Sequence, residues 1–162
     1  QRLPWGILLL FGGGLSMASA ISSTGLAAWI GSGIGSLQNW PIVFLVVIVI
    51  SLMVFLTEMT SNTASTATFL PILASIAIGL GENPLLFAIP TVLAASCAFM
   101  LPVATPPNAI VYGSGRITIP EMSRAGLLLN LLFIALLSLG ALTFFGFVFG
   151  VEIGVLPEWA NR

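Results

Sequence analysis

Long apolar runs separated by short polar interruptions dominate this chain of 162 residues. A helix needs about 20 apolar residues to cross the hydrocarbon core of a bilayer, and runs approaching that length recur along the whole sequence. The pattern therefore predicts an all-α integral membrane protein with spanning helices. The apolar runs cover residues 4–20, 41–56, 64–80, 84–101 and 125–151.

A polar interruption, Thr-Glu-Met-Thr-Ser-Asn-Thr at residues 57–63, separates two runs that are each short for a full crossing at about 1.5 Å per helical residue. Backbone that leaves the helix inside a membrane survives only within protein or beside a wet cavity, so polar breaks indicate binding sites. We interpret residues 41–80 as a re-entrant helical hairpin whose tip lies near the middle of the bilayer. Two full crossings joined on the far side are the alternative, because charge does not distinguish the two topologies.

A second interruption, at residues 101–108, contains three prolines. Proline ends a helix and is well accepted in the first turn of a new one. The helix that begins near Pro84 is expected to end at Leu101, and a short second half follows, so that residues 84–114 form one broken helix. A last transmembrane helix is expected at about residues 122–151.

The start of the chain predicts two further elements. Residues 1–20 are expected to form a spanning helix. Residues 21–40 mix small polar residues and glycines with Trp29 and Trp40. Because indole rings favour the membrane interface, we interpret residues 21–40 as an amphipathic interfacial helix, with an ordinary polar loop as the alternative.

Composition excludes most other classes of protein. Apolar residues make up 58% of the chain and charged residues only 6%, whereas a soluble domain carries about 25% charged residues. The sequence contains no His, Lys or Asp, which argues against an enzyme because most proton-transfer and covalent catalysis uses these residues. A net charge of −1 without a basic patch excludes nucleic acid as a partner.

The few charged residues separate by sign under this topology. The positive-inside rule places the arginine-rich face in the cytoplasm, and we expect the membrane to be the inner membrane of a bacterium. The arginines of that face are Arg2, Arg116 and Arg124, and the glutamates of the opposite face are Glu82, Glu152 and Glu158.

At each interruption, the end of one helix and the start of the next are expected at the same depth in the membrane. The helix starts near Thr63 and Pro107 present free N–H groups and a partial positive charge, which suit a carboxylate. The preceding helix ends, at residues 57–60 and 101–104, offer carbonyl oxygens that suit Na+. No Arg or Lys is close in sequence, so a co-bound cation would have to balance the anion, which is a physical reason to couple the two. Side-chain oxygens that can serve either ligand are those of Thr57, Ser61, Asn62, Thr63 and Thr105.

Glu58 is the one carboxylate of the first interruption, and we expect it to lie inside the protein because a lipid-facing charge is costly. Two roles are open: a protonated structural group that bonds the amides of the tip, or an ionised group that senses the charge of Na+. Two rival functions also remain. A channel would show a continuous polar stripe along its helices, and a purely structural membrane subunit would tolerate loss of Asn62 and Thr63.

Ser61-Asn62-Thr63 follows Thr57-Glu58, and about forty residues later comes Ala104-Thr105-Pro106-Pro107-Asn108-Ala109. This pair of motifs resembles the divalent anion:sodium symporter family, whose members carry succinate, citrate and sulfate. The resemblance covers essentially the whole chain and implies the second of two inverted repeats. It implies sodium-coupled transport of a di- or tricarboxylate, with anion exchange or another oxyanion such as sulfate as the alternative.

The resemblance also implies a role for individual residues. Those that would contact a substrate carboxylate or line its pocket are Asn62, Thr63, Thr105 and Pro106. Those that would hold one Na+ are Thr57, Asn62 and the carbonyl groups of Thr60 and Ala104. Supporting residues are Glu58, Ser61 and Asn108.

Members of this family work by an elevator motion, in which a transport domain slides against a fixed dimeric scaffold. By that resemblance, residues 1–20 belong to the scaffold, 21–40 form the connecting arm, and 41–162 belong to the transport domain of a homodimer. The first repeat, with its own Ser-Asn-Thr tip and a second Na+ site, is not in this sequence. We therefore expect a fragment that cannot transport alone.

Overall fold

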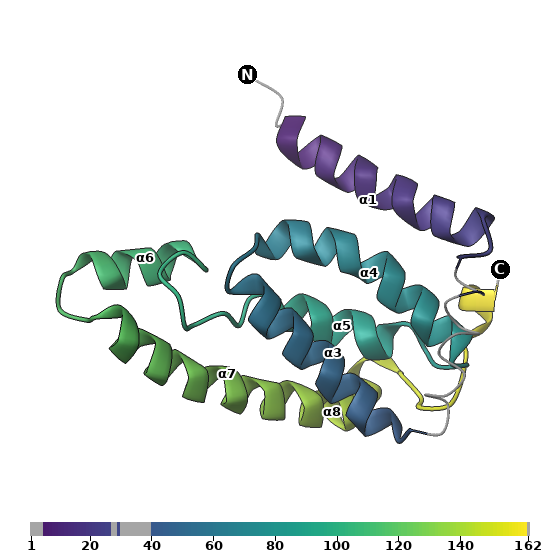
Figure 1. Ribbon diagram of the computed structural model, residues 1–162. Coiled ribbons are helices and arrows are strands. Elements are labelled where there is room, and N and C mark those ends of the chain that lie inside the picture. Colours follow the sequence, from purple (N-terminus) through teal and green to yellow (C-terminus); the bar gives the residue numbers. More distant parts are fainter. Residues whose placement is uncertain (1–4, 27–28, 30–39, 162) are drawn as a thin grey trace.

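A computed structural model describes residues 5–26, 29 and 40–161 of the protein. These residues form helices joined by turns, and no strand occurs among them, in agreement with the all-α prediction. In chain order the elements are α1 (Trp5–Ser23), α3 (Ile42–Thr57), α4 (Asn62–Gly79), α5 (Leu85–Ala94), α6 (Pro106–Gly113), α7 (Ile119–Leu142), α8 (Phe144–Phe149) and a final 3-10 turn (Glu158–Asn161) (Figure 1).

α3 and α4 form an antiparallel helical hairpin, and residues 58–61 make its turn (Figure 1). Ser61 ends the turn by capping α4, since its hydroxyl oxygen accepts a hydrogen bond from the Ala64 N–H at 3.3 Å. This cap satisfies one of the N–H groups that a helix start leaves without a partner. The hairpin predicted for residues 41–80 thus has one helix in each arm. Its entry into a membrane stays a prediction.

The run that begins at Pro84 is helical only as far as Ala94, although the sequence predicted helix to Leu101. That prediction is wrong, because residues 95–105 form turns and irregular backbone. The N–H groups of residues 99–101 donate to the side chains of Glu58 and Asn130 and not to helix carbonyls. Tertiary hydrogen bonds therefore end α5 well before Pro102.

The last predicted helix is divided in the structure. α7 begins at Ile119, where the Glu121 carboxylate accepts hydrogen bonds from the N–H of Thr118 at 2.8 Å and from its hydroxyl at 2.7 Å. A glutamate that reaches back to the N–H of the residue before the helix stabilises a helix start. The prediction of one helix to residue 151 is wrong: the backbone leaves helical geometry at Thr143 (φ −128°, ψ −71°), and α8 follows at the bend.

α3, α4, α5 and α7 pack around one apolar core, while α1 packs along α4. Ile50, Phe87 and Ile134 are buried in that core, to which α4 also contributes buried residues. α1 extends to Ser23, three residues beyond the predicted boundary at residue 20. Residues 27–28 and 30–39 of the predicted interfacial helix lie outside the described residues.

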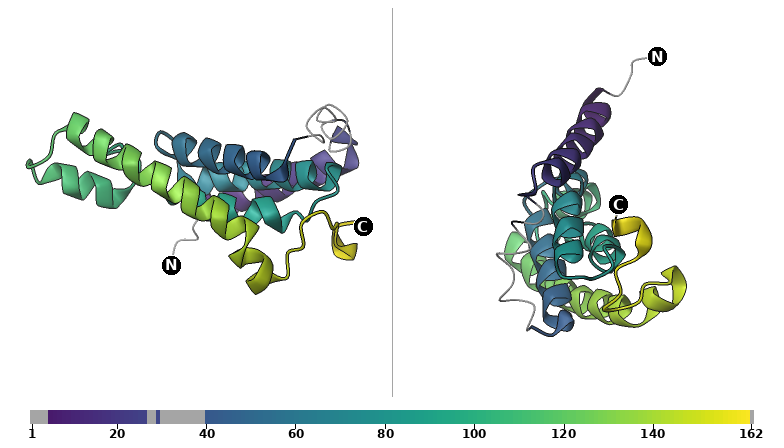
Figure 2. Two further views of the ribbon diagram at one scale, coloured as in Figure 1. Left: turned by 90° about the horizontal axis from the view of Figure 1, so that it is seen from below. Right: turned by 90° about the vertical axis from the view of Figure 1, so that its right-hand side faces the viewer.

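Two of the described helices have the length and composition of membrane-spanning segments. α4 and α7 are long and apolar enough to cross a membrane, and α3 and α5 are shorter apolar helices. α7 leaves leucines such as Leu128 and Leu139 exposed. Figure 2 shows α6 and the α6–α7 turn at one end of the molecule and the α4–α5 turn at the other. Arg116 and Glu82, which lie in these two turns, are thus at opposite ends.

Candidate functional site

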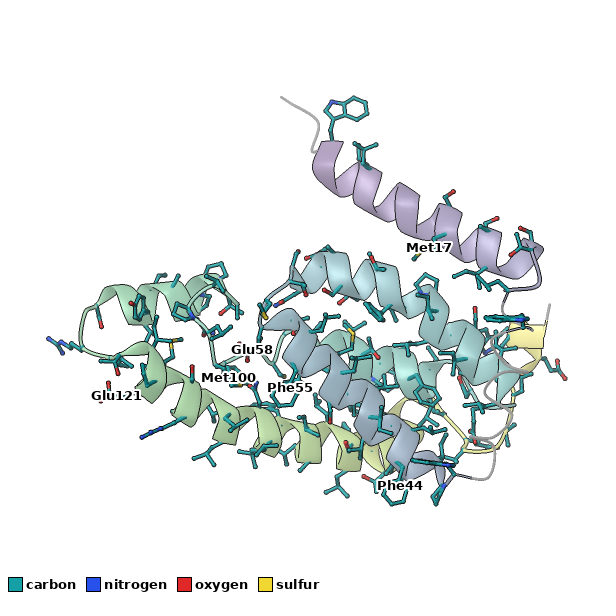
Figure 3. All side chains as sticks on the ribbon, in the orientation of Figure 1. Met17, Phe44, Phe55, Glu58, Met100 and Glu121 are labelled. Carbon is teal, nitrogen blue, oxygen red and sulfur yellow. The ribbon has the colours of Figure 1, made fainter. Side chains whose placement is uncertain are left out.

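Glu58 joins the hairpin turn to the unwound segment between α5 and α6. Its carboxylate accepts the Met100 N–H at 2.9 and 3.1 Å and the Leu101 N–H at 3.0 Å. Glu58 is only 4% exposed, so these bonds take the place of water. Glu58 and Met100 lie next to each other beside α7 (Figure 3). The two interruptions therefore meet in space, and the partners of Glu58 are amides of the second interruption and not those of the tip.

Asn130 of α7 completes this network, and the sequence analysis did not identify it. Its Nδ2 donates to Glu58 Oε1 at 2.7 Å, and its Oδ1 accepts the Phe99 N–H at 3.2 Å. The residue is fully buried. A signal was present in the sequence, because Asn130 is the one amide in the apolar run 125–151. A polar group inside a membrane helix is expected to face a partner in the protein interior.

α7 holds the unwound segment along one of its faces. The Ser123 hydroxyl donates to the Met100 carbonyl oxygen at 3.3 Å. One helical turn before Asn130, Gly126 permits a close approach of the two backbones. A Cβ atom at Gly126 would lie 2.3 Å from the Phe99 carbonyl oxygen and 2.5 Å from the Met100 Cα. Gly126 is therefore required where α7 meets the break.

Asn108 bridges α6 and the unwound segment, while its supporting role in a binding site stays a prediction. Its Nδ2 donates to the carbonyl oxygens of Ala98 and Leu101, both at 3.0 Å. The Thr105 hydroxyl oxygen accepts the Asn108 N–H at 3.3 Å and so caps α6. The Leu101 carbonyl, one of those expected to be available to a cation, is thus already bonded to an amide.

The threonine hydroxyls of the tip also bond within the chain. Thr57 Oγ1 donates to the Met53 carbonyl at 2.9 Å, and Thr60 Oγ1 donates to the Leu56 carbonyl at 2.8 Å. The Thr60 hydroxyl is also 2.7 Å from that of Ser65. A donating hydroxyl keeps its oxygen lone pairs, so these bonds orient the oxygens without preventing them from acting as ligands.

Asn62 differs from its neighbours at the tip. Its Oδ1 is buried and has no hydrogen-bond partner among the described residues. Leaving such an acceptor without a partner costs about 1–3 kcal/mol. Asn62 is the first residue of α4, and a buried, unpaired amide oxygen suits a hard cation or a hydrogen-bond donor. This oxygen without a partner is consistent with the predicted place of Asn62 among the oxygen ligands of Na+.

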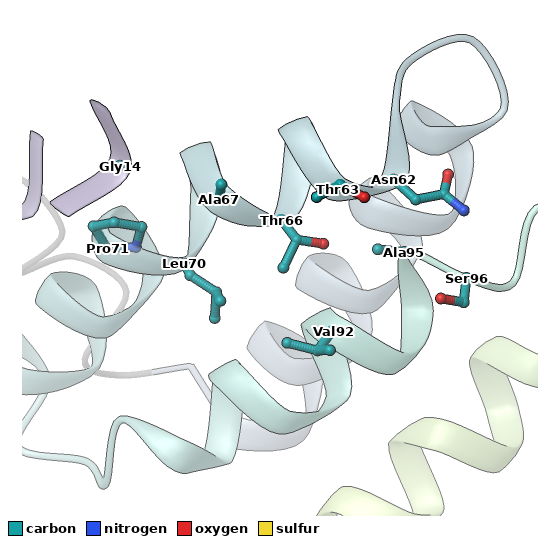
Figure 4. Close-up of a pocket in the computed structure, with 10 residues that line it drawn as sticks. All are labelled: Gly14, Asn62, Thr63, Thr66, Ala67, Leu70, Pro71, Val92, Ala95 and Ser96. Carbon is teal, nitrogen blue, oxygen red and sulfur yellow. The ribbon is translucent and has the colours of Figure 1, made fainter. Parts of the chain in front are cut away.

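A pocket of about 410 Å³ opens beside Asn62, between α1, α4 and α5 (Figure 4). Asn62 and Thr63 line it from the start of α4, and Ser96 lines it from just beyond the end of α5. The volume lies within the range of small-molecule sites. Thr105 and Pro106 are not among its described lining residues, so their place in a shared pocket stays a prediction.

Residues 1–151 match the profile of the sodium:sulfate symporter transmembrane region. The chain belongs to the sodium:sulfate symporter family. The resemblance stated from the two motifs is thereby confirmed, and the family and the relatives that match are transporters and not enzymes.

Relatives of this chain are named as dicarboxylate transporters and cotransporters. The sodium-dependent dicarboxylate transporter SdcS of Staphylococcus saprophyticus is 44% identical over 94% of this chain and 30% of its own length. The Na(+)/dicarboxylate cotransporter 3 proteins of Rattus norvegicus and Homo sapiens are each 43% identical over 99% of this chain and 26% of their own lengths. The chain thus spans less than a third of the length of these curated relatives.

Proposed function

We propose that this chain supplies one half of the substrate site and one Na+ site of a sodium-coupled dicarboxylate transporter. The observation that carries the proposal is the Oδ1 of Asn62, which is buried and without a hydrogen-bond partner in the described part of the chain, in a residue that lines the 410 Å³ pocket. A buried acceptor beside an open pocket suits the binding of a ligand better than it suits packing.

The proposed substrate is a small dicarboxylate such as succinate. Relatives that match 94% and 99% of this chain carry dicarboxylate in their names. The Asn62 Nδ2 and the Thr63 hydroxyl can donate to a carboxylate at the start of α4, where the helix N–H groups add a partial positive charge. Sulfate remains the alternative, because the family description names it, and exchange is the alternative to symport.

The proposed Na+ ligands are oxygens from both interruptions. Asn62 and Thr57 would contribute side-chain oxygens, and Thr60 and Ala104 would contribute carbonyls. When bound, Na+ supplies a positive charge beside the anion. Arg116 and Arg124 are both exposed, so neither neutralises a buried carboxylate. Asn62 can face both ligands at once, since its Oδ1 accepts and its Nδ2 donates.

The depth of the tip supports re-entry of the hairpin. Glu58 bonds Asn130, which lies midway along the 24 residues of α7. At about 1.5 Å per residue, Asn130 lies roughly 16 Å from the start of α7. If α7 spans the membrane, the hairpin turn therefore lies near the midplane, although α4 is long enough to cross.

The remaining parts of the proposal follow from the family resemblance. α1 would belong to a fixed scaffold, residues 21–40 to a connecting arm, and residues 41–162 to a moving transport domain. The whole transporter would be a homodimer that contains an N-terminal repeat, in a bacterial inner membrane with Arg2, Arg116 and Arg124 on the cytoplasmic side.

The test is uptake of labelled succinate into proteoliposomes, with an inward gradient of Na+ or of choline as the control. The full-length polypeptide that carries this sequence, its Asn62→Ala variant and this chain alone are assayed in parallel. We expect Na+-dependent uptake by the full-length protein, a loss of at least tenfold in the variant, and none by the chain alone. Succinate uptake that is the same with and without Na+ and in the Asn62→Ala variant would refute the proposal. If sulfate or citrate inhibits succinate uptake by competition, that anion becomes the candidate substrate.

A further inference from the structure

Asn130 lies in a helix that contributes no residue to the ligand set proposed above, yet it contacts both the hairpin turn and the unwound segment. Its Nδ2 bonds Glu58 of the turn, and its Oδ1 bonds the Phe99 N–H of the unwound segment. We propose that Asn130 is a positioning residue for the cation site, holding the hairpin tip and the unwound segment at a fixed separation. The inference rests on the proposed function, because it concerns the same Na+ site.

The need for such a residue comes from where the proposed ligands lie. The Thr60 carbonyl and Asn62 belong to the tip, whereas the Ala104 carbonyl belongs to the unwound segment. Metal-ligand distances must hold to within about 0.2 Å, so the two segments must keep their relative position. Among the described residues, the side-chain bonds between them are those of Glu58 to Met100 and Leu101.

α7 fixes both partners of these bonds. Asn130 orients the Glu58 carboxylate directly and holds the unwound segment through Phe99, while Gly126 and Ser123 bring the segment against the same face. Without the Asn130 amide, Glu58 Oε1 would keep only the hydrogen bond from the Met100 N–H. The Phe99 N–H would lose its acceptor. Both ends of the amide are engaged in this way, so Asn130 acts on the site through its neighbours and not as a ligand.

The first experiment measures the Na+ concentration that gives half-maximal succinate uptake by the full-length protein. We expect Asn130→Ala to raise this concentration about tenfold, the size of one lost charge-assisted hydrogen bond, while the rate at saturating Na+ stays within about twofold. Ser138→Ala is the matched control, because Ser138 is also buried on α7 but its hydroxyl has no partner among the described residues. Equal Na+ dependence in the two variants would overturn the inference.

A second measurement does not depend on transport. The melting temperature of the detergent-solubilised protein is followed against NaCl at constant ionic strength made up with choline chloride. Asn130→Ala, or Asn130→Ser if the alanine variant does not fold, should require about tenfold more Na+ for half of the stabilisation. Na+ stabilisation without succinate uptake would count against the proposed substrate only. The inference would be wrong if the variant and the unsubstituted protein needed the same Na+ concentration for half of the rise in melting temperature. It would also be wrong if Na+ did not raise the melting temperature of the unsubstituted protein more than choline does.

The pathway of the effect is tested by combining substitutions. If Asn130 acts through Glu58, the double variant Glu58→Gln/Asn130→Ala should need little more Na+ than the more affected single variant, because residues of one network are not additive. If the increase in the required Na+ concentration in the double variant equals the product of the increases in the two single variants, Asn130 acts independently of Glu58, and this assignment is wrong.

Discussion

Glu58 is a buried carboxylate whose described hydrogen bonds all come from N–H groups. The N–H groups of Met100 and Leu101 and the amide of Asn130 donate to it, at distances from 2.7 to 3.1 Å. Each of these donors finds a carboxylate oxygen, which accepts. The contacts favour a structural role for Glu58 in bonding amides, and these amides belong to the unwound segment and to Asn130, not to the tip.

Glu58→Gln should therefore destabilise the protein. The amide NH₂ that replaces one oxygen would face N–H donors, and leaving them without an acceptor costs about 1–3 kcal/mol. We expect the melting temperature in detergent to fall by several degrees. Glu82→Gln is the control: Glu82 Oε2 accepts the Gly154 N–H at an exposed site, and a glutamine oxygen can accept the same bond. Equal melting temperatures for the two variants would contradict the structural role.

At the scale of elements, α7 is the surface that holds the unwound segment. Its buried residues recur at intervals of three or four and form one stripe along the helix: Met122, Gly126, Asn130, Ile134, Ser138 and Ala141. The N-terminal part of this stripe contacts the unwound segment, and Ile134 and Ala141 belong to the apolar core with α3 and α5. One helix thus positions the break and anchors it to the core.

Gly126→Ala should disrupt this contact more than its size suggests. The new methyl group would meet backbone atoms of Phe99 and Met100 at 2.3–2.5 Å, and overpacking typically costs about 1–3 kcal/mol. Gly140→Ala, on the same helix, meets only the Phe145 ring at 3.5 Å and should be neutral or slightly stabilising. Thermal unfolding in detergent should separate the two variants, and an unchanged melting temperature for Gly126→Ala would rule out the close approach.

The sequence predicted the helical arms because apolar runs and prolines are local signals. It predicted that Glu58 lies inside the protein because a polar residue inside an apolar run needs a partner, and Glu58 is buried. The prediction of helix failed after Ala94 and at residue 143, where the run of apolar residues continues but the helix does not. The end of α5 depends on hydrogen bonds to Glu58 and Asn130, which are distant in sequence. Such tertiary contacts have no signature in a local pattern.

At the scale of the whole molecule, the hairpin turn meets α7 halfway along its length and not at its end. Both ends of the hairpin lie toward the α4–α5 turn, whereas α6 and the α6–α7 turn project beyond the tip (Figures 1 and 2). This arrangement supports the proposed re-entry of the hairpin, whereas the sign of the charges is the same for re-entry and for two crossings.

Spin labels on single cysteines, in a Cys97→Ser background, should report this depth. Met59 in the turn is 82% exposed and Leu131 in the middle of α7 is 51% exposed, so both positions accept a label. Under the re-entrant topology, labels at Met59→Cys and Leu131→Cys in reconstituted full-length protein report distances to the bilayer surface that agree to within about one helical turn of 5.4 Å. A label at Ser114→Cys should lie near the headgroups. A Met59 label at the headgroup depth would show two full crossings instead.

The unwound segment is held through its main chain, since the bonds from residues 99–101 to Glu58 and Asn130 all begin at backbone N–H groups. Every residue except proline carries that group. The side chains at positions 99–101 are therefore free to diverge between relatives without loss of this attachment, provided that proline does not enter. Glu58 and Asn130 have no such freedom, because a change in one alters what the other must bond. Among relatives, we expect the side chains at positions 99–101 to vary and Glu58 and Asn130 to change together.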